Sequence, residues 1–207
     1  MDINSIGEKI SEKYFAYYHK KMDSRDLEEL LKISHIKEYR QNELICHIDE
    51  ELHYVGLIME GIVRSYYIDA NGNEKTHFFH TEIYTIMDDG LFGAKKSSRM
   101  YQPLSNVTAI LFKIDDILTL IHENETFKEI YITSMENAMR YRLQRERDFL
   151  TKSATERYLE FIHDYPDFIN KIKQSYIASY LGISPVSLSR IKGELHDREN
   201  HLEEETS

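Results

Sequence analysis

The side chains best suited to recognising another molecule lie between Ser184 and Lys192, near the carboxyl end of the 207-residue chain. A helix over residues 185–195 would leave its small polar and basic groups outside the apolar stripe, namely Ser184, Val186, Ser187, Ser189, Arg190 and Lys192. Hydroxyl groups both donate and accept hydrogen bonds, and a guanidinium donates through a rigid fork. Such a helix surface is suited to contacts with base edges and phosphates in the major groove of DNA.

Residues 174–191, QSYIASYLGISPVSLSRI, predict how this surface is held in place. Gly182 suits a left-handed turn after a first short helix, and Ser184 followed by Pro185 is a start signal for a second. The small Ala178 lets the two helices approach closely, and the apolar residues fall where a helix-turn-helix needs its core: Ile177, Leu181, Ile183, Leu188 and Ile191. In DNA-binding proteins the second helix of this motif enters the major groove. The alternative is an ordinary helical hairpin in a protein core.

The charge of this region is opposite to that of the chain. The formal net charge of the whole chain is −10, yet residues 168–193, beginning at Phe168, contain no Asp or Glu. The same window carries Lys171, Lys173, Arg190 and Lys192. A basic window in an acidic protein favours a polyanionic ligand, so we expect double-stranded DNA as the partner.

Composition bounds the remaining possibilities. With 41% hydrophobic and 30% charged residues, the chain is typical of a soluble protein of one large or two small domains. We expect no signal peptide, no membrane span, no membrane partner and a cytoplasmic location. The single cysteine, Cys46, excludes a disulfide framework and a four-cysteine cluster within one chain. We expect Cys46 to be a buried small hydrophobe, with redox sensing as the alternative, and the acidic tail after Leu195 to be frayed.

The first half of the chain predicts a β-rich domain. Ser24 is placed to cap an early helix, and from about His35 apolar residues recur with a period of two. Turns are predicted at Glu60-Gly61 and Asn71-Gly72, the latter a strong hairpin signal. The predicted strands span residues 44–48, 54–59, 63–68, 76–79 and 107–114. Many short strands with frequent turns indicate a sandwich, jelly roll or barrel.

A long helix follows, with Asn124 as its cap and an end near Leu150, roughly 40 Å away. It carries two apolar stripes: Phe127, Tyr131, Ser134, Ala138 and Tyr141 form one, and Ile132, Met135, Met139, Leu143 and Leu150 form the other. We expect one stripe to pack on the β-domain and the other on a second copy as a coiled coil. The sequence does not decide which, and a central helix in a monomer is the alternative. Ser153 begins a capping box and a further helix through Ile162.

This order of β-roll, long helix and helix-turn-helix resembles the Crp/Fnr family of bacterial transcription regulators. The resemblance is strongest in ERYLEF and YIASYLGIS…LSRI within residues 153–195, and IMEGIVRSYYIDANGNEKTHFF is consistent with the sensor roll. It implies an α+β fold with a cyclic-nucleotide-binding-like β-roll in 1–123, a dimerisation helix in 124–152 and a helix-turn-helix domain in 153–207. It implies a non-enzymatic homodimer on a two-fold-related operator, with RNA polymerase as a further candidate partner.

The resemblance also assigns contacts to residues. Family positions that reach the groove correspond to Pro185, Val186, Ser189 and Arg190, and Ser187 is placed to reach a phosphate. Arg190 is the best reader of a base, because a guanidinium bonds guanine O6 and N7 together. Lys173 and Ser175, at the start of the first helix, are candidates for backbone phosphate.

The sensor region departs from the family pattern. Cyclic-nucleotide binders carry a Gly-Glu pair and an Arg followed by Ser or Thr, but here Arg99 precedes Met100 and no Gly-Glu pair comes before it. We therefore expect no cyclic AMP dependence and no cofactor, and the small-molecule effector is unknown. Arg99 either serves another anionic effector in a pocket or is a surface arginine, and we favour the surface arginine. The single cysteine excludes the oxygen-sensing cluster of the family.

Two other functions compete with this interpretation. A small-barrel metalloenzyme of the cupin type would use His77, His80 and Glu82 as ligands. Strand geometry disfavours it, because residues three apart face opposite sides of a regular strand. An interaction protein that has lost DNA binding is the other alternative, and the basic window speaks against it.

Overall fold

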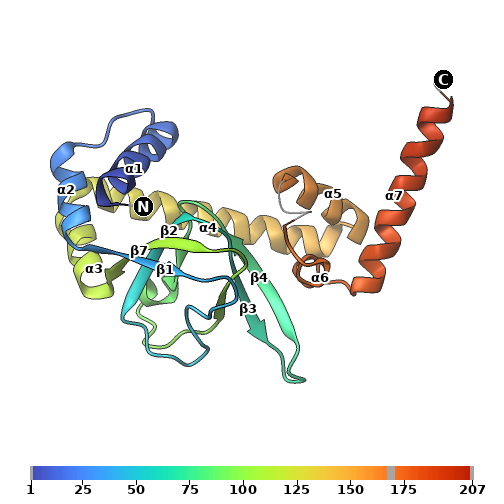
Figure 1. Cartoon of the computed structure of the whole chain (residues 1–207), viewed down its shortest axis with the longest axis horizontal. Helices are drawn as coiled ribbons and strands as arrows, with labels where there is room; N and C mark the ends of the chain where they lie inside the picture. Colours follow the sequence, from blue (N-terminus) through green and yellow to red (C-terminus); the bar gives the residue numbers. More distant parts are fainter. Residues whose placement is uncertain (1, 167–170, 206–207) are drawn as a thin grey trace. The chain divides into compact units, whose positions relative to one another are not determined.

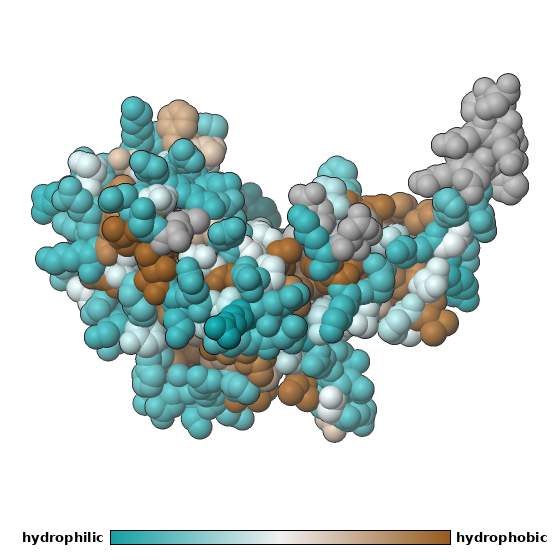
Figure 2. All heavy atoms as spheres, in the orientation of Figure 1, coloured by the Kyte–Doolittle hydropathy of each residue, from teal (hydrophilic) through white to brown (hydrophobic). Residues whose placement is uncertain are grey.

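The computed structural model of the chain describes residues 2–166 and 171–205, and side chains up to residue 197. The chain forms two compact units, Met1–Gly72 with His77–Asn137 and Asn73–Thr76 with Ala138–Ser207, so the long helix contributes to both. Phe168, where the carboxylate-free window begins, lies outside the described residues. No described helix is both long and apolar enough to cross a bilayer. Most of the face seen in Figure 2 is hydrophilic, with separate hydrophobic areas.

The first unit is built on two antiparallel sheets (Figure 1). The described strands are β1 (Ser34–Tyr39), β2 (Tyr54–Glu60), β3 (Val63–Ile68), β4 (Glu74–His80), β5 (Thr85–Ile86), β6 (Met100–Pro103) and β7 (Val107–Lys113). One sheet has the order β1-β7-β2-β5 and the other β4-β3-β6. Strand β7 pairs antiparallel with both β1 and β2, and β6 pairs antiparallel with β3. The predicted α+β fold with a β-roll is confirmed.

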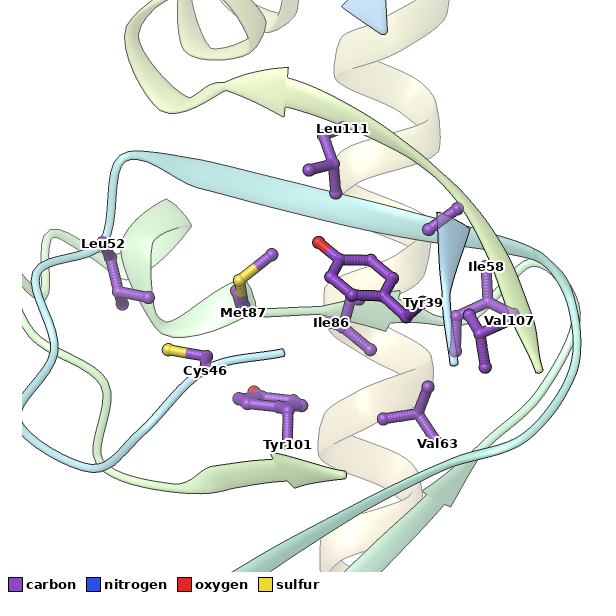
Figure 3. Close-up of a cluster of buried hydrophobic side chains, with 11 residues drawn as sticks. Tyr39, Cys46, Leu52, Ile58, Val63, Ile86, Met87, Tyr101, Val107 and Leu111 are labelled. Carbon is purple, nitrogen blue, oxygen red and sulfur yellow. The ribbon is translucent and has the colours of Figure 1, made fainter. Parts of the chain in front are cut away.

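Two apolar clusters hold this roll together. The first fills its interior, where Tyr39, Ile58 and Tyr101 pack from different strands (Figure 3). Cys46 is a buried member of this cluster, and burial raises the pKa of its thiol to about 11, as expected of a small hydrophobe. The second cluster lies between the four-stranded sheet and the flanking helices, and it includes Phe127 of the long helix.

The segment Leu44–Ile48 is not a strand, so this prediction was wrong. Its backbone pairs with the neighbouring strand only at an isolated bridge between Cys46 and Tyr101. The Ile45 N–H donates to the Tyr101 carbonyl at 2.9 Å, and the Tyr101 N–H donates to the Cys46 carbonyl at 3.0 Å. The apolar residues in this run fill the roll without forming a ladder.

The helices of the first unit are α1 (Ile3–Tyr18), α2 (Ser24–Lys32), the short 3₁₀ turn η1 (Asp88–Phe92) and α3 (Ile114–Glu123). Asp23, and not Ser24 as predicted, caps α2, because its carboxylate accepts a hydrogen bond from the Arg25 N–H at 2.8 Å. Aspartate is as good a cap as serine, and the neighbouring pair left the sequence ambiguous by one residue.

The long helix is α4 (Glu125–Thr151), and Asn124 caps it as predicted by accepting from the Thr126 N–H at 2.9 Å. Helix α5 (Ala154–Asp164) begins with the predicted capping box between Ser153 and Glu156. The last two helices are α6 (Gln174–Leu181) and α7 (Pro185–Glu205). The expected fraying after Leu195 was wrong at the level of the backbone, since residues 196–205 continue α7 and contain no Gly or Pro to end it.

Candidate nucleic-acid interface

Helices α6 and α7 follow each other through a short turn (Figure 1). They share the small apolar core that the sequence predicts for a helix-turn-helix. Ile177 and Ala178 are fully buried, Leu181, Leu188 and Ile191 are nearly so, and Ile183 is half-buried. Ala178 is fully buried, and its small methyl side chain allows the two helices to pack closely. The polar side of α7 is thereby fixed outward.

The turn between the helices has the predicted chemistry. Gly182 has φ 71°, in the left-handed region, and the Ile183 N–H donates to the Ala178 carbonyl at 3.0 Å. The Ser184 hydroxyl accepts a hydrogen bond from the Ser187 N–H at 3.0 Å, which caps α7 at its first turn. Ser187 is therefore partly committed to the cap, since its own hydroxyl also lies 2.9 Å from that of Ser184.

None of the predicted contact residues is buried. The exposed ones are Lys173, Ser175, Ser184, Pro185, Val186, Ser189 and Arg190, and Ser187 and Lys192 are half-buried. The Arg190 side chain is 76% exposed and lies 3.8 Å from the Glu194 carboxylate. The Lys192 ammonium donates to Gln174 at 3.4 Å, and the Lys173 ammonium lies over the Tyr176 ring. The structure gathers these side chains around α7 and the start of α6.

Two arginines that the sequence analysis missed brace this helix pair. The Arg145 guanidinium donates to the Tyr180 carbonyl at 2.7 Å, and that of Arg157 donates to the Leu181 carbonyl at 3.2 Å. Both guanidiniums lie within 5 Å of the centre of the Phe149 ring. They satisfy the last carbonyls of α6, which an α-helix leaves without internal partners. No local signal predicts them, because their partners lie 24 and 35 residues away.

Arg99 is not a surface arginine, so the favoured alternative was wrong. Its side chain is 3% exposed, and its guanidinium pairs with Asp88 at 2.8 Å and with Asp89 at 2.5 Å, both in η1. Burial opposes ionisation of Asp89, but hydrogen bonds from Ser98 and the charge of Arg99 outweigh it and lower the pKa of this carboxyl. The positive charge of Arg99 is thus matched inside the protein.

Strand alternation predicted that His77 and His80 point to opposite sides of β4. This prediction was wrong, because both rings lie against the same hydroxyl. The Ser65 hydroxyl lies 3.3 Å from His77 Nδ1 and 2.9 Å from His80 Nε2. The residues Phe78, Phe79 and His80 are all buried, so β4 is covered on both faces, and the side to which a residue points does not decide whether it is enclosed.

Glu82, the third proposed metal ligand, is ion-paired with Lys9 and Lys13. Burial, with the charges of Arg99 and His77, lowers the pKa of His80 to about 3. Among the described residues, no three His, Cys, Asp or Glu side chains are placed to hold a metal ion.

No family model and no curated protein sequence matches the chain, but many solved structures do. FixK2 from Bradyrhizobium japonicum is 19% identical, with a TM-score of 0.70 over 81% of this chain and 86% of that one. The global regulator CLP from Xanthomonas campestris, described as responsive to c-di-GMP, is 12% identical, with a TM-score of 0.70 over 86% and 93%. The catabolite activator protein of Thermus thermophilus is 16% identical, with a TM-score of 0.55 over 86% and 85%.

This chain has the fold of the Crp/Fnr regulators. The predicted resemblance is therefore confirmed at the level of the fold. At identities of 12–19% the comparisons do not assign contact residues, so the roles of Arg190 and its neighbours rest on the geometry of α6 and α7.

Proposed function

We propose that the protein is a sequence-specific, double-stranded-DNA-binding transcription regulator of the Crp/Fnr type. The observation that carries the proposal is the division of α7 into two sides. Leu188 and Ile191 are buried against α6, while Val186, Ser189 and Arg190 are exposed. A helix whose apolar side packs on a supporting helix, and whose exposed side carries small polar and basic groups, fits the major groove.

Within this proposal the residues divide into base readers and phosphate binders. Arg190 reads a guanine, and Pro185, Val186 and Ser189 line the groove, where Val186 offers apolar contact to a thymine methyl. Ser184, Ser187, Lys192, Lys173 and Ser175 lie toward the phosphates. Contacts to phosphate position the helix without reading sequence.

We further propose a homodimer joined through α4. Phe127, from the first predicted stripe, is buried in the first unit, and Tyr141 bonds to the Tyr180 hydroxyl at 2.7 Å, so that stripe is used within the chain. The second stripe is open to solvent: Ile132, Met139, Leu143 and Leu150 are 49%, 56%, 59% and 80% exposed. Residues 132, 139, 143 and 150 repeat with heptad spacing, which favours a two-stranded coiled coil. Two copies would place their α7 helices on half-sites about 10 bp apart.

We propose that the regulator does not depend on cyclic AMP. An arginine that binds a cyclic phosphate must offer its charge to the ligand. Arg99 already faces two carboxylates from η1 and is nearly closed to solvent. A phosphate would have to displace Asp88 and Asp89 from a buried ion pair, which is costly.

Genomic footprinting of the tagged protein, followed by fluorescence anisotropy on a recovered site, tests the proposal. Binding should weaken steeply as salt rises from 50 to 200 mM, because phosphate contacts release counterions. Arg190→Ala should cost roughly 1–3 kcal/mol on the preferred site and relax one base position. Lys173→Ala should weaken all sequences equally. Equal, sequence-independent losses from both variants would refute this division, and absence of binding at low salt would refute DNA recognition altogether.

A further inference from the structure

The second half of α4 carries a charge pattern that the chain itself does not use. Glu146 falls in the heptad row formed by Met139, Leu143 and Leu150, at a position where a coiled coil usually has an apolar residue. On the flanks of this row lie three arginines, Arg140, Arg142 and Arg147, and Phe149 beside Leu150. All four apolar and acidic residues of the row are exposed.

These charges have few partners within the chain. In the described part of the protein, neither Glu146, Arg140 nor Arg142 makes an ion pair or a side-chain hydrogen bond. Arg147 bonds to Gln144 and lies 3.9 Å from Asp148. Arg142 and Glu146 are four residues apart, a spacing at which opposite charges on a helix can pair, yet they do not. Glu146, Arg140 and Arg142 are thus open to pairing with another molecule, and Arg147 is held only by contacts along its own helix.

A second copy of the chain supplies the matching charges. In a parallel two-stranded coil with Leu143 and Leu150 at a positions, Glu146 is at d and packs against the e position of the other helix. That position is Arg147, and Arg142 occupies the neighbouring g position. Each Glu146 would therefore meet Arg147 of the other copy. Because a g position faces an e position of the other helix, Arg142 and Arg147 also face each other across the coil, and Glu146 offsets the repulsion between these two arginines.

We propose that Glu146 of each copy pairs with Arg147 of the other copy, beside Arg142 of its own helix, and that this pairing restricts α4 to partnering with a second copy of the same chain. The inference rests on the proposed homodimer and adds the basis of its selectivity. A regulator of the same fold with an apolar or a basic residue in place of Glu146 would leave these arginines without an acidic partner or facing a like charge. Specificity then comes from rejecting wrong partners as well as from binding the right one.

A charge-exchange experiment on the full chain tests this pairing. Glu146→Arg makes the site wholly basic, and Arg142→Glu combined with Arg147→Glu makes it wholly acidic. Each variant alone should form a homodimer at least about tenfold weaker than the native one in sedimentation equilibrium, because like charges then face each other. Mixed in equal amounts, the two should form mainly the heterodimer, measured by native mass spectrometry of mass-labelled chains. Glu8→Arg, which makes the same charge change on an exposed residue of α1, should leave dimerisation unchanged.

The outcomes separate the two proposals. A native protein that stays monomeric at all concentrations overturns the homodimer and, with it, this inference. A native dimer whose variants assemble as tightly as the parent, or mix in the statistical ratio, overturns only the charge pairing. Circular dichroism of each variant confirms that the fold is intact. Raising the salt concentration should reduce the preference for the heterodimer, since exposed ion pairs are screened.

Discussion

The Arg190 guanidinium lies 3.8 Å from the Glu194 carboxylate, one turn further along α7. Both side chains are exposed, at 76% and 57%. Arg190, the residue proposed to read a base, is therefore paired with the Glu194 carboxylate in the protein without DNA. Glu194 is the first carboxylate after the acid-free window, so DNA must either share Arg190 with it or displace it.

Replacing Glu194 by Gln should tighten binding to DNA. The change removes a negative charge close to the phosphates and releases Arg190 from a surface pair worth about 0.2–1 kcal/mol. We expect a gain of about twofold to fivefold in affinity, measured by anisotropy at fixed salt. Glu129→Gln, which breaks the exposed pair with Lys20 in the first unit, serves as the matched control. Weaker binding of the Glu194 variant would show that the pair orients Arg190 productively, and unchanged binding would show that Glu194 does not compete with DNA.

Gly182 should tolerate no side chain. Its φ of 71° disfavours any other residue, and a β-carbon would lie 2.7 Å from Cε1 of Phe149. Gly182→Ala should therefore lower the free energy of unfolding by about 1–3 kcal/mol, measured by urea titration. In a Phe149→Ala background the contact with the ring disappears and only the strain of a positive φ remains, so Gly182→Ala should lower the free energy of unfolding by less. Equal losses in both backgrounds would show that the ring moves aside at no cost.

The helix-turn-helix could be predicted because its determinants are local. Gly182, Ser184 and Pro185 mark the turn, and the apolar residues around them repeat with helical spacing inside 18 residues. The same holds for the capping box at Ser153. Even the Arg190–Glu194 pair has a sequence signal, the spacing of four residues.

The surroundings of Arg99 could not be predicted in this way. Its partners lie 10 and 11 residues earlier, in a short 3₁₀ turn whose position depends on the whole roll. Nothing in a one-dimensional pattern states that a charged residue between two serines and a methionine is buried. The failure at His77 and His80 is similar, because burial of three successive residues of β4 reflects what covers the strand and not its period.

The ion pair of Asp89 with Arg99 should make the free energy of unfolding depend on pH in the acidic range. Its pKa in the folded protein is lowered from the ordinary value of 3.8, so its contribution is complete above that value and is lost as pH falls through the folded pKa. Asp89→Asn should cost about 1.5–3 kcal/mol at pH 7, the worth of hydrogen bonds to a charged group. The difference from the native protein should shrink below pH 4 in urea titrations. Asp116→Asn on α3 is the control, and a difference independent of pH would contradict the assignment.

The exposed row on α4 leads to a last prediction, in which Leu143→Asp turns the dimer into a monomer. Leu143 is 59% exposed, so the folded monomer should keep its unfolding transition, whereas each dimer loses two buried leucines. Burial of a leucine is worth about 1.5–3 kcal/mol, so the dissociation constant should rise by about 100-fold or more in sedimentation velocity. Binding to a two-fold DNA site should fall accordingly, while binding to a single half-site should not change. Leu159→Asp, at a 42% exposed leucine of α5, introduces the same charge away from the row and should leave the dimer intact. A Leu143 variant that sediments as a dimer and binds the two-fold site normally would place the interface on another surface.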